Sequence, residues 1–175
     1  MGDLLTLADR EERFAALTHT QAVWVALVCA ERLVSGDTAD RHDALREALD
    51  TAWDALRTRQ TESAAALAAR LEDRDDVDDD PVAATTFALQ AVAGMPEAAR
   101  WGADRGIDDA FERVPHQPGV RVAFGPLDPD TASEVVQQEL RWQLAAADVV
   151  SHAKSPDEVK AWVQEQPGPT EPCPS

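Results

Sequence analysis

The chain has 175 residues and carries 33 Asp and Glu against 16 Lys and Arg, which gives a formal net charge of −17. This charge argues against nucleic acid and an anionic membrane surface as partners, because both are bound through clustered Lys and Arg, and it allows a basic protein. The length fits one domain whose core needs no disulfide or metal. Because the sequence has only two cysteines, Cys29 and Cys173, it indicates a reducing, cytoplasmic environment.

A first helix is predicted over residues 4–17, and a break at residues 18–20 offers Thr18 or Thr20 as the cap of the next one. That next helix covers residues 21–34, QAVWVALVCAERLV, in which every residue from 22 to 30 is apolar. A helix that is apolar on all sides has no solvent face and must be enclosed by other helices. Leu27 is therefore predicted to be a core residue, and Gly36 is predicted to end the helix in a left-handed conformation.

Helical segments follow at residues 45–56, with one apolar stripe, and at residues 61–70, either as two helices or as one continuous helix. The segment EDRDDVDDD, residues 72–80, superficially resembles a calcium loop, but Pro81 occupies the place where that loop needs glycine for its sharp turn. The segment is therefore interpreted as a solvated linker whose Asp80 caps the following helix. Its exposed carboxylates are candidate contacts for a basic partner: Asp75, Asp76, Asp78 and Asp79.

A second helix that is apolar nearly all round is predicted at residues 82–95, with Leu89 in its core and small residues that allow close packing. Helices are also predicted at residues 96–114, from Asp130 or Thr131 to about residue 153, and at 156–164. Residues 115–129 indicate an irregular loop with a short extended piece at 120–124. The predicted fold is an all-α, single-domain bundle of seven to eight helices over residues 1–166, followed by a disordered proline-rich tail at 167–175.

Glu31 is the polar residue of greatest interest, because it follows Trp24 and Val28 on one stripe of the central helix. It is predicted to be partly buried with Arg32 or with an arginine from another helix. Such a carboxylate either forms a structural ion pair or, with a raised pKa, transfers protons. The sequence has no catalytic motif, metal-ligand spacing or phosphate loop, so no catalytic, cofactor-binding or metal residue is predicted. Trp101 and Trp162 are predicted as exposed interface residues.

Three segments carry a resemblance to a known family: VCAERL at residues 28–33, ALDTAWDAL at 48–56 and EVVQQELRWQL at 134–144. Together they resemble the YjaG-like domain-of-unknown-function family of bacterial cytoplasmic proteins, over about residues 4–153. The chain departs from that pattern after Leu33, where the family continues with a proline and a tyrosine-containing turn. The resemblance implies an all-α single domain with no established activity, and it transfers no catalytic residue.

These observations favour a non-enzymatic protein whose acidic surface engages a basic partner, as an immunity protein, an antitoxin or an adaptor does. One alternative is a small enzyme with a carboxylate-centred site near Glu31. Another is a housekeeping protein adapted to high salt, in which the acidic charge carries no information about partners. The sequence does not separate these alternatives, and it does not give the oligomeric state.

Overall fold

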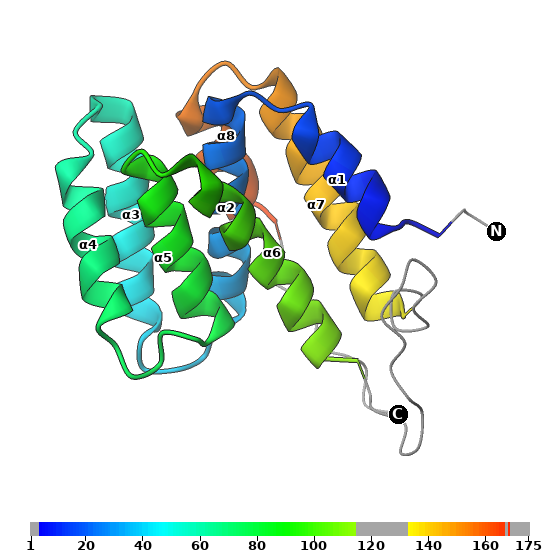
Figure 1. Ribbon diagram of the computed structural model, residues 1–175, viewed down its shortest axis with the longest axis horizontal. Coiled ribbons are helices and arrows are strands. Elements are labelled where there is room, and N and C mark those ends of the chain that lie inside the picture. The colour runs from blue at the N-terminus through cyan, green and yellow to red at the C-terminus, as the bar shows by residue number, and fades with distance from the viewer. Residues whose placement is uncertain (1–3, 115–132, 167, 169–175) are drawn as a thin grey trace.

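The computed structural model describes residues 4–114, 133–166 and 168, and within these residues the fold is all-α, as predicted (Figure 1). The loop and extended piece predicted within residues 115–129, and all of the predicted tail except Gly168, lie outside the described residues. The helices are α1 (Leu7–Ala15), α2 (His19–Gly36), α3 (His42–Thr58), α4 (Glu62–Glu72), α5 (Asp80–Val92), α6 (Pro96–Glu112), α7 (Glu134–His152) and α8 (Pro156–Gln164).

Helix α2 is the centre of the bundle, as its apolar sequence predicts. Every residue from Val23 to Val34 is buried, and the helix contacts α3, α5, α6, α7 and α8. Helix α5 is the second apolar helix and packs against α2 and α6. Figure 1 shows α3 and α4 on one side of this pair, and α1 lying along α7 on the other. Leu27 and Leu89 are both fully buried, which confirms the two predicted core positions.

The helix ends follow local capping chemistry, with three differences from the sequence predictions. Thr18 caps α2 in a capping box, but α2 continues through Gly36, and Asp37 ends it in an extended conformation with no left-handed residue. Helix α5 begins at Asp80, so its capping position is Asp79, one residue before the predicted Asp80. Helix α7 begins with Ser133 as its cap, whose hydroxyl accepts from the Val136 amide, while both residues predicted as its cap lie outside the described residues.

A chain of buried polar side chains ties α7 to α1, α2 and α6. The Arg32 Nε donates to Glu139 Oε2 at 2.9 Å, and Gln143 Nε2 donates to Glu139 Oε1 at 3.0 Å. The Arg10 Nε then donates to Gln143 Oε1 at 2.6 Å, and its guanidinium pairs with Asp104 at 2.8 Å. Because each charge in this chain has an opposite charge or a hydrogen-bond partner, the burial of the two arginines and Glu139 is tolerated.

Shortening a core residue of α5 tests the central packing. Leu89→Ala should lower the free energy of unfolding by about 2–5 kcal/mol, because it removes buried apolar surface and leaves a cavity. Urea denaturation measures this loss. Leu4→Ala is the control, because Leu4 is 60% exposed, and it should change stability by less than about 0.5 kcal/mol. An equal effect of the two substitutions would contradict the enclosure of α5.

A glycine on α6 tests the polar chain. A Cβ at Gly106 would lie 2.8 Å from both Gln143 Nε2 and Glu139 Oε1, so Gly106→Ala must displace this buried pair. We expect a loss of about 1–3 kcal/mol in the free energy of unfolding, measured by urea denaturation. The matched control is Gly102→Ala on the same helix, where the nearest atom to a new Cβ is 3.4 Å away. If both variants are equally stable, α6 and α7 do not pack this closely.

Candidate functional site

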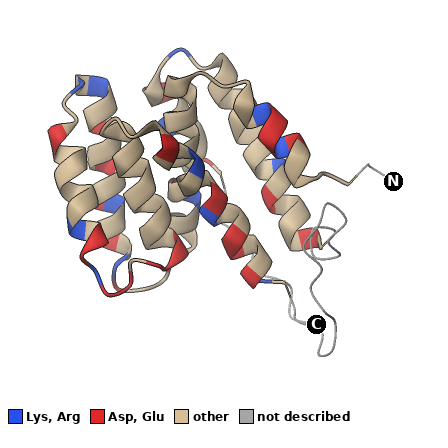
Figure 2. Ribbon diagram, viewed as in Figure 1, with Lys and Arg blue, Asp and Glu red and all other residues tan. Residues whose placement is uncertain are grey.

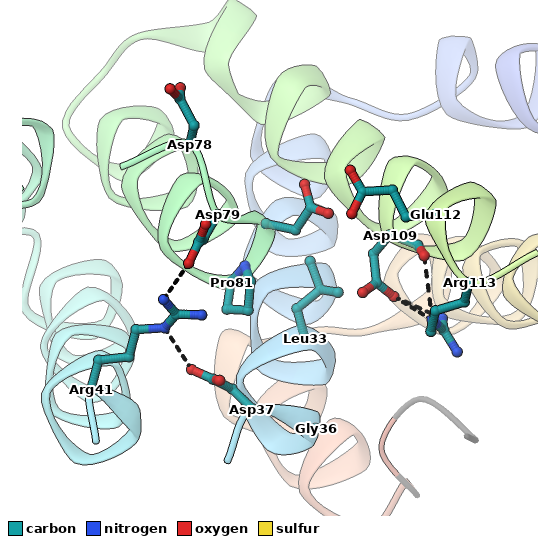
Figure 3. A pocket seen from close by; sticks show the side chains of 11 residues that line it. Leu33, Gly36, Asp37, Arg41, Asp78, Asp79, Pro81, Asp109, Glu112 and Arg113 are labelled. Atoms are coloured by element: carbon teal, nitrogen blue, oxygen red, sulfur yellow. Dashed lines mark hydrogen bonds and ion pairs between the residues drawn. The ribbon is translucent and has the colours of Figure 1, made fainter. Parts of the chain in front are cut away.

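The candidate site is a cavity of about 440 Å³ at the end of the bundle where α2 ends, α5 begins and α6 ends (Figure 3). We call it the acidic pocket, because six carboxylates and two arginines line it, together with Leu33, Gly36 and Pro81. The charged lining residues are Asp37, Asp78, Asp79, Asp80, Asp109, Glu112, Arg41 and Arg113.

Three separate parts of the sequence build the acidic pocket. The turn between α2 and α3 supplies Asp37 and Arg41, and the acidic segment before α5 supplies its aspartates. The last turn of α6 and the residue after it supply the rest. Figure 2 shows this concentration of acidic residues along the loop before α5 and along α6. The acidic segment is therefore one wall of a cavity, a role that its charge alone does not indicate.

Arg41 neutralises one side of the acidic pocket. Its Nε donates to Asp37 Oδ2 at 2.9 Å, and its Nη1 pairs with Asp76 and with Asp79. Although burial opposes the charge of Arg41, the hydrogen bonds to Asp79, Asp37 and Asp76 raise the pKa of its guanidinium. Hydrogen bonds from Arg74 hold the pKa of Asp76 well below its usual range, and those from Arg41 contribute further. This side of the pocket is a closed network of ion pairs.

The side formed by α6 is less completely neutralised. Arg113 pairs with Asp109 at 2.7 Å, whereas no ion pair within the described residues involves Asp78 or Glu112. In Figure 3 the Glu112 carboxylate points toward the start of α5, and that of Asp78 points away from Arg41. The acidic pocket therefore retains negative charge at the α5–α6 junction.

Asp80 lies at this junction with a side chain only 9% exposed. Among the described residues, Arg105 forms an ion pair with Asp80, with 3.5 Å between Arg105 Nη1 and Asp80 Oδ1, and none of these residues donates a hydrogen bond to the carboxylate. Burial, together with the nearby carboxylates of Glu112, Asp109 and Asp108, raises the pKa of Asp80 to about 6 against the opposing effect of Arg105. The sequence predicted a helix cap here, and a buried carboxyl is found instead.

The four predicted aspartates do not behave alike. Asp78 and Asp79 line the acidic pocket, and Asp79 is paired with Arg41. Asp76 lies outside the lining in ion pairs with Arg41 and Arg74, whereas Asp75 is exposed. Sequence reasoning missed Asp37, Asp80, Asp109 and Glu112, because their convergence depends on how α2, α5 and α6 pack.

The two predicted interface tryptophans also differ. Trp101 on α6 is 46% exposed and meets the Phe87 ring edge-on, with 5.6 Å between centroids. Trp162 on α8 is half-buried against the core and stacks on Trp142 at 6.1 Å. Trp162 therefore serves mainly in packing, and Trp101 is the exposed member of the pair.

Glu31 is buried, with 3% exposure, and an arginine from another helix pairs with it. Its Oε2 pairs with Arg46 of α3, and its Oε1 accepts a hydrogen bond from Trp53 Nε1 at 2.8 Å. The adjacent Arg32 pairs instead with Glu139 on α7, because successive residues on a helix point about 100° apart. The Glu31 and Arg32 side chains thus belong to two separate ion pairs. Since both Glu31 oxygens are engaged, its contacts favour the structural interpretation over proton transfer.

The remaining chemistry is limited within the described part of the chain. There, no group of three or more His, Cys, Asp or Glu residues is arranged to hold a metal ion. Cys29 is buried, and burial raises the pKa of its thiol, so it acts as a small core residue. Over the same described residues, none of the helices combines the length and the apolar character needed to cross a bilayer.

Comparisons with protein-family models, with curated proteins and with solved structures find no match to this chain. The resemblance to the YjaG-like family stays a prediction, and the function has to be argued from the site itself.

The pKa of Asp80 predicts a dependence of stability on pH. Because its pKa of about 6 in the folded protein exceeds the ordinary 3.8, the stability contribution is fully present below pH 3.8 and is lost as the pH rises through 6. The native protein should therefore lose this contribution between about pH 4.5 and 7.5, whereas Asp80→Asn has none to lose. Over that range the free energy of unfolding of Asp80→Asn should rise by about 1–2 kcal/mol relative to that of the native protein. Urea denaturation at both pH values measures the difference.

The control for this experiment is Asp75→Asn, which removes an exposed carboxylate of the same loop. Its stability relative to the native protein should be nearly the same at both pH values. If the Asp80 variant also shows no change with pH, the carboxyl of Asp80 has an ordinary environment in the folded protein.

Proposed function

We propose that this chain is a non-enzymatic, cytoplasmic binding protein that engages a basic protein partner, as immunity proteins, antitoxins and acidic adaptors do. The observation that carries the proposal is the acidic pocket, a cavity in which carboxylates outnumber arginines. Asp78 and Glu112 form no ion pair among the described residues, and Asp80 has an ion-pair contact with Arg105 at 3.5 Å but no hydrogen bond from these residues. A cationic group from outside would relieve the resulting repulsion.

The chemistry of the acidic pocket suits an arginine side chain of the partner. A guanidinium is planar, stays charged at all physiological pH values and can donate to two carboxylates at once. Between α5 and α6 it would lie near Asp80 and Glu112, which come from different helices. The net negative charge of the protein would accelerate the approach of a basic partner, and Asp80 and Glu112 would determine where its guanidinium binds.

The exposed face of α6 extends this surface. Trp101, Asp108 and Glu112 are all exposed and are separated by seven and four residues, so they lie within about 20–40° of one another on one stripe of the helix. The stripe runs for about 16 Å from the tryptophan to the rim of the acidic pocket. An exposed tryptophan beside carboxylates is a favourable anchor for a basic segment that also carries an apolar residue.

The proposal is tested with a fluorescein-labelled hexaarginine peptide and fluorescence anisotropy at low salt. Glu112→Gln should weaken binding by about threefold to fivefold, because it removes one charge at the rim of the acidic pocket. The matched control is Glu97→Gln, which makes the same change at the opposite, N-terminal end of α6. The control should change the affinity much less.

Two results would contradict the proposal. If the native protein does not bind the peptide, the acidic pocket is not a site for cationic side chains. If Glu112→Gln and Glu97→Gln weaken binding equally, the peptide responds to the total charge, which favours the alternative of a salt-adapted acidic surface.

A further inference from the structure

We propose that Asp80 is a proton switch for the acidic pocket: its ionised carboxylate accepts the cationic side chain of the partner, and its protonated form releases it. This inference rests on the proposed function and adds its regulation. It concerns one group in the acidic pocket, which combines a buried side chain with the lack of a hydrogen bond from any described residue.

The first observation is the weak compensation of the Asp80 carboxylate, which has an ion-pair contact with Arg105 at 3.5 Å but no hydrogen bond from the described residues. Its side chain is nine-tenths buried, yet no described residue donates a hydrogen bond to it. As the first residue of α5, Asp80 lies where the backbone amides of a helix would normally favour a negative charge. A buried carboxylate without a hydrogen-bond donor is costly to ionise, so a proton or an external cation is favoured beside it.

The second observation is the set of charges around Asp80. Helix α6 presents three carboxylates to it, those of Asp108, Asp109 and Glu112, and one cation, Arg105. Asp109 is itself paired at 2.7 Å with Arg113, the residue after α6, so Asp108 and Glu112 carry most of the excess negative charge. Arg105 also lies over the Phe87 ring, 5.8 Å from its centroid, so its position is shared between two contacts. The imbalance on this helix leaves the ionised form of Asp80 poorly compensated.

The remaining charges near the acidic pocket come from the α2–α3 turn and from the loop before α5. Asp37 and Asp79 are both held by Arg41, which also binds Asp76. Leu33 of α2 contributes an apolar wall. Since Arg41 already has three carboxylate partners, it is not available to neutralise Asp80. Ionisation of Asp80 therefore changes the net charge of the acidic pocket.

Binding and protonation are then linked by thermodynamics. A guanidinium beside Asp80 favours its ionised form, so binding releases a proton when the pH is near 6, and protonation weakens binding by the same factor. If the bound cation restores an ordinary carboxyl, the affinity at pH 5 should be about tenfold lower than at pH 7.5. The arginine probe does not titrate in this range.

The experiment measures hexaarginine affinity from pH 5 to pH 7.5 for the native protein, Asp80→Asn and Asp75→Asn. The affinity of the native protein and of the Asp75→Asn control for hexaarginine should be about tenfold lower at pH 5 than at pH 7.5. Asp80→Asn should bind weakly at every pH with a much flatter profile, because its amide is neutral throughout. Carboxyl NMR of the free native protein provides an independent reading, with a titration midpoint of Asp80 near pH 6.

The outcomes separate the two proposals. Binding that weakens equally with pH in the native protein and in Asp80→Asn overturns the switch and leaves the proposed function intact. An Asp80 midpoint near pH 4 also overturns the switch. If the native protein does not bind the peptide at any pH, the proposed function fails and the switch fails with it.

Discussion

The complete enclosure of α2 is the constraint on which the rest of the fold depends. From Val23 to Val34 this helix has no exposed residue, so the other helices must surround it. The small residues of α5 and α6 allow two neighbours to approach closely, and α3, α7 and α8 cover the remaining sides. Burial of apolar area in this arrangement provides the main driving force for folding.

Enclosure also determines where the polar residues of α2 find partners. Glu31 and Arg32 lie in the last buried turns, and each would be an uncompensated buried charge without a partner from another helix. Arg46 and Trp53 of α3 satisfy Glu31, while Glu139 of α7 satisfies Arg32. These two ion pairs fix α3 and α7 on different sides of α2. Apolar packing alone does not specify which helix lies on which side, and the ion pairs do.

Much of the fold could be predicted from local pattern alone. The apolar periodicity predicts the helices, and Thr18 indicates one of the caps, because these features depend on residues close together in the sequence. The partner of Glu31 and the position of Asp80 could not be predicted in this way. Both depend on the packing of helices that are distant in sequence, and the single sequence does not show which charges that packing brings together.

The same distinction applies to the acidic pocket. A net charge of −17 suggests a basic partner, but the charge is distributed over both paired and unpaired groups. Three aspartates that add to this net charge are paired with Arg41 in the fold, namely Asp37, Asp76 and Asp79. These ion pairs reduce the charge that a partner meets.

What distinguishes one part of this acidic surface from the rest is therefore burial rather than the number of carboxylates. An exposed carboxylate is solvated by water and has little to gain from a cation, whereas a buried one without a hydrogen-bond donor has much to gain. Asp80 meets this condition, and Glu112 from the facing helix adds to its charge. A partner that inserts a guanidinium between α5 and α6 would be selected by this local imbalance, and the remaining acids would mainly accelerate its approach.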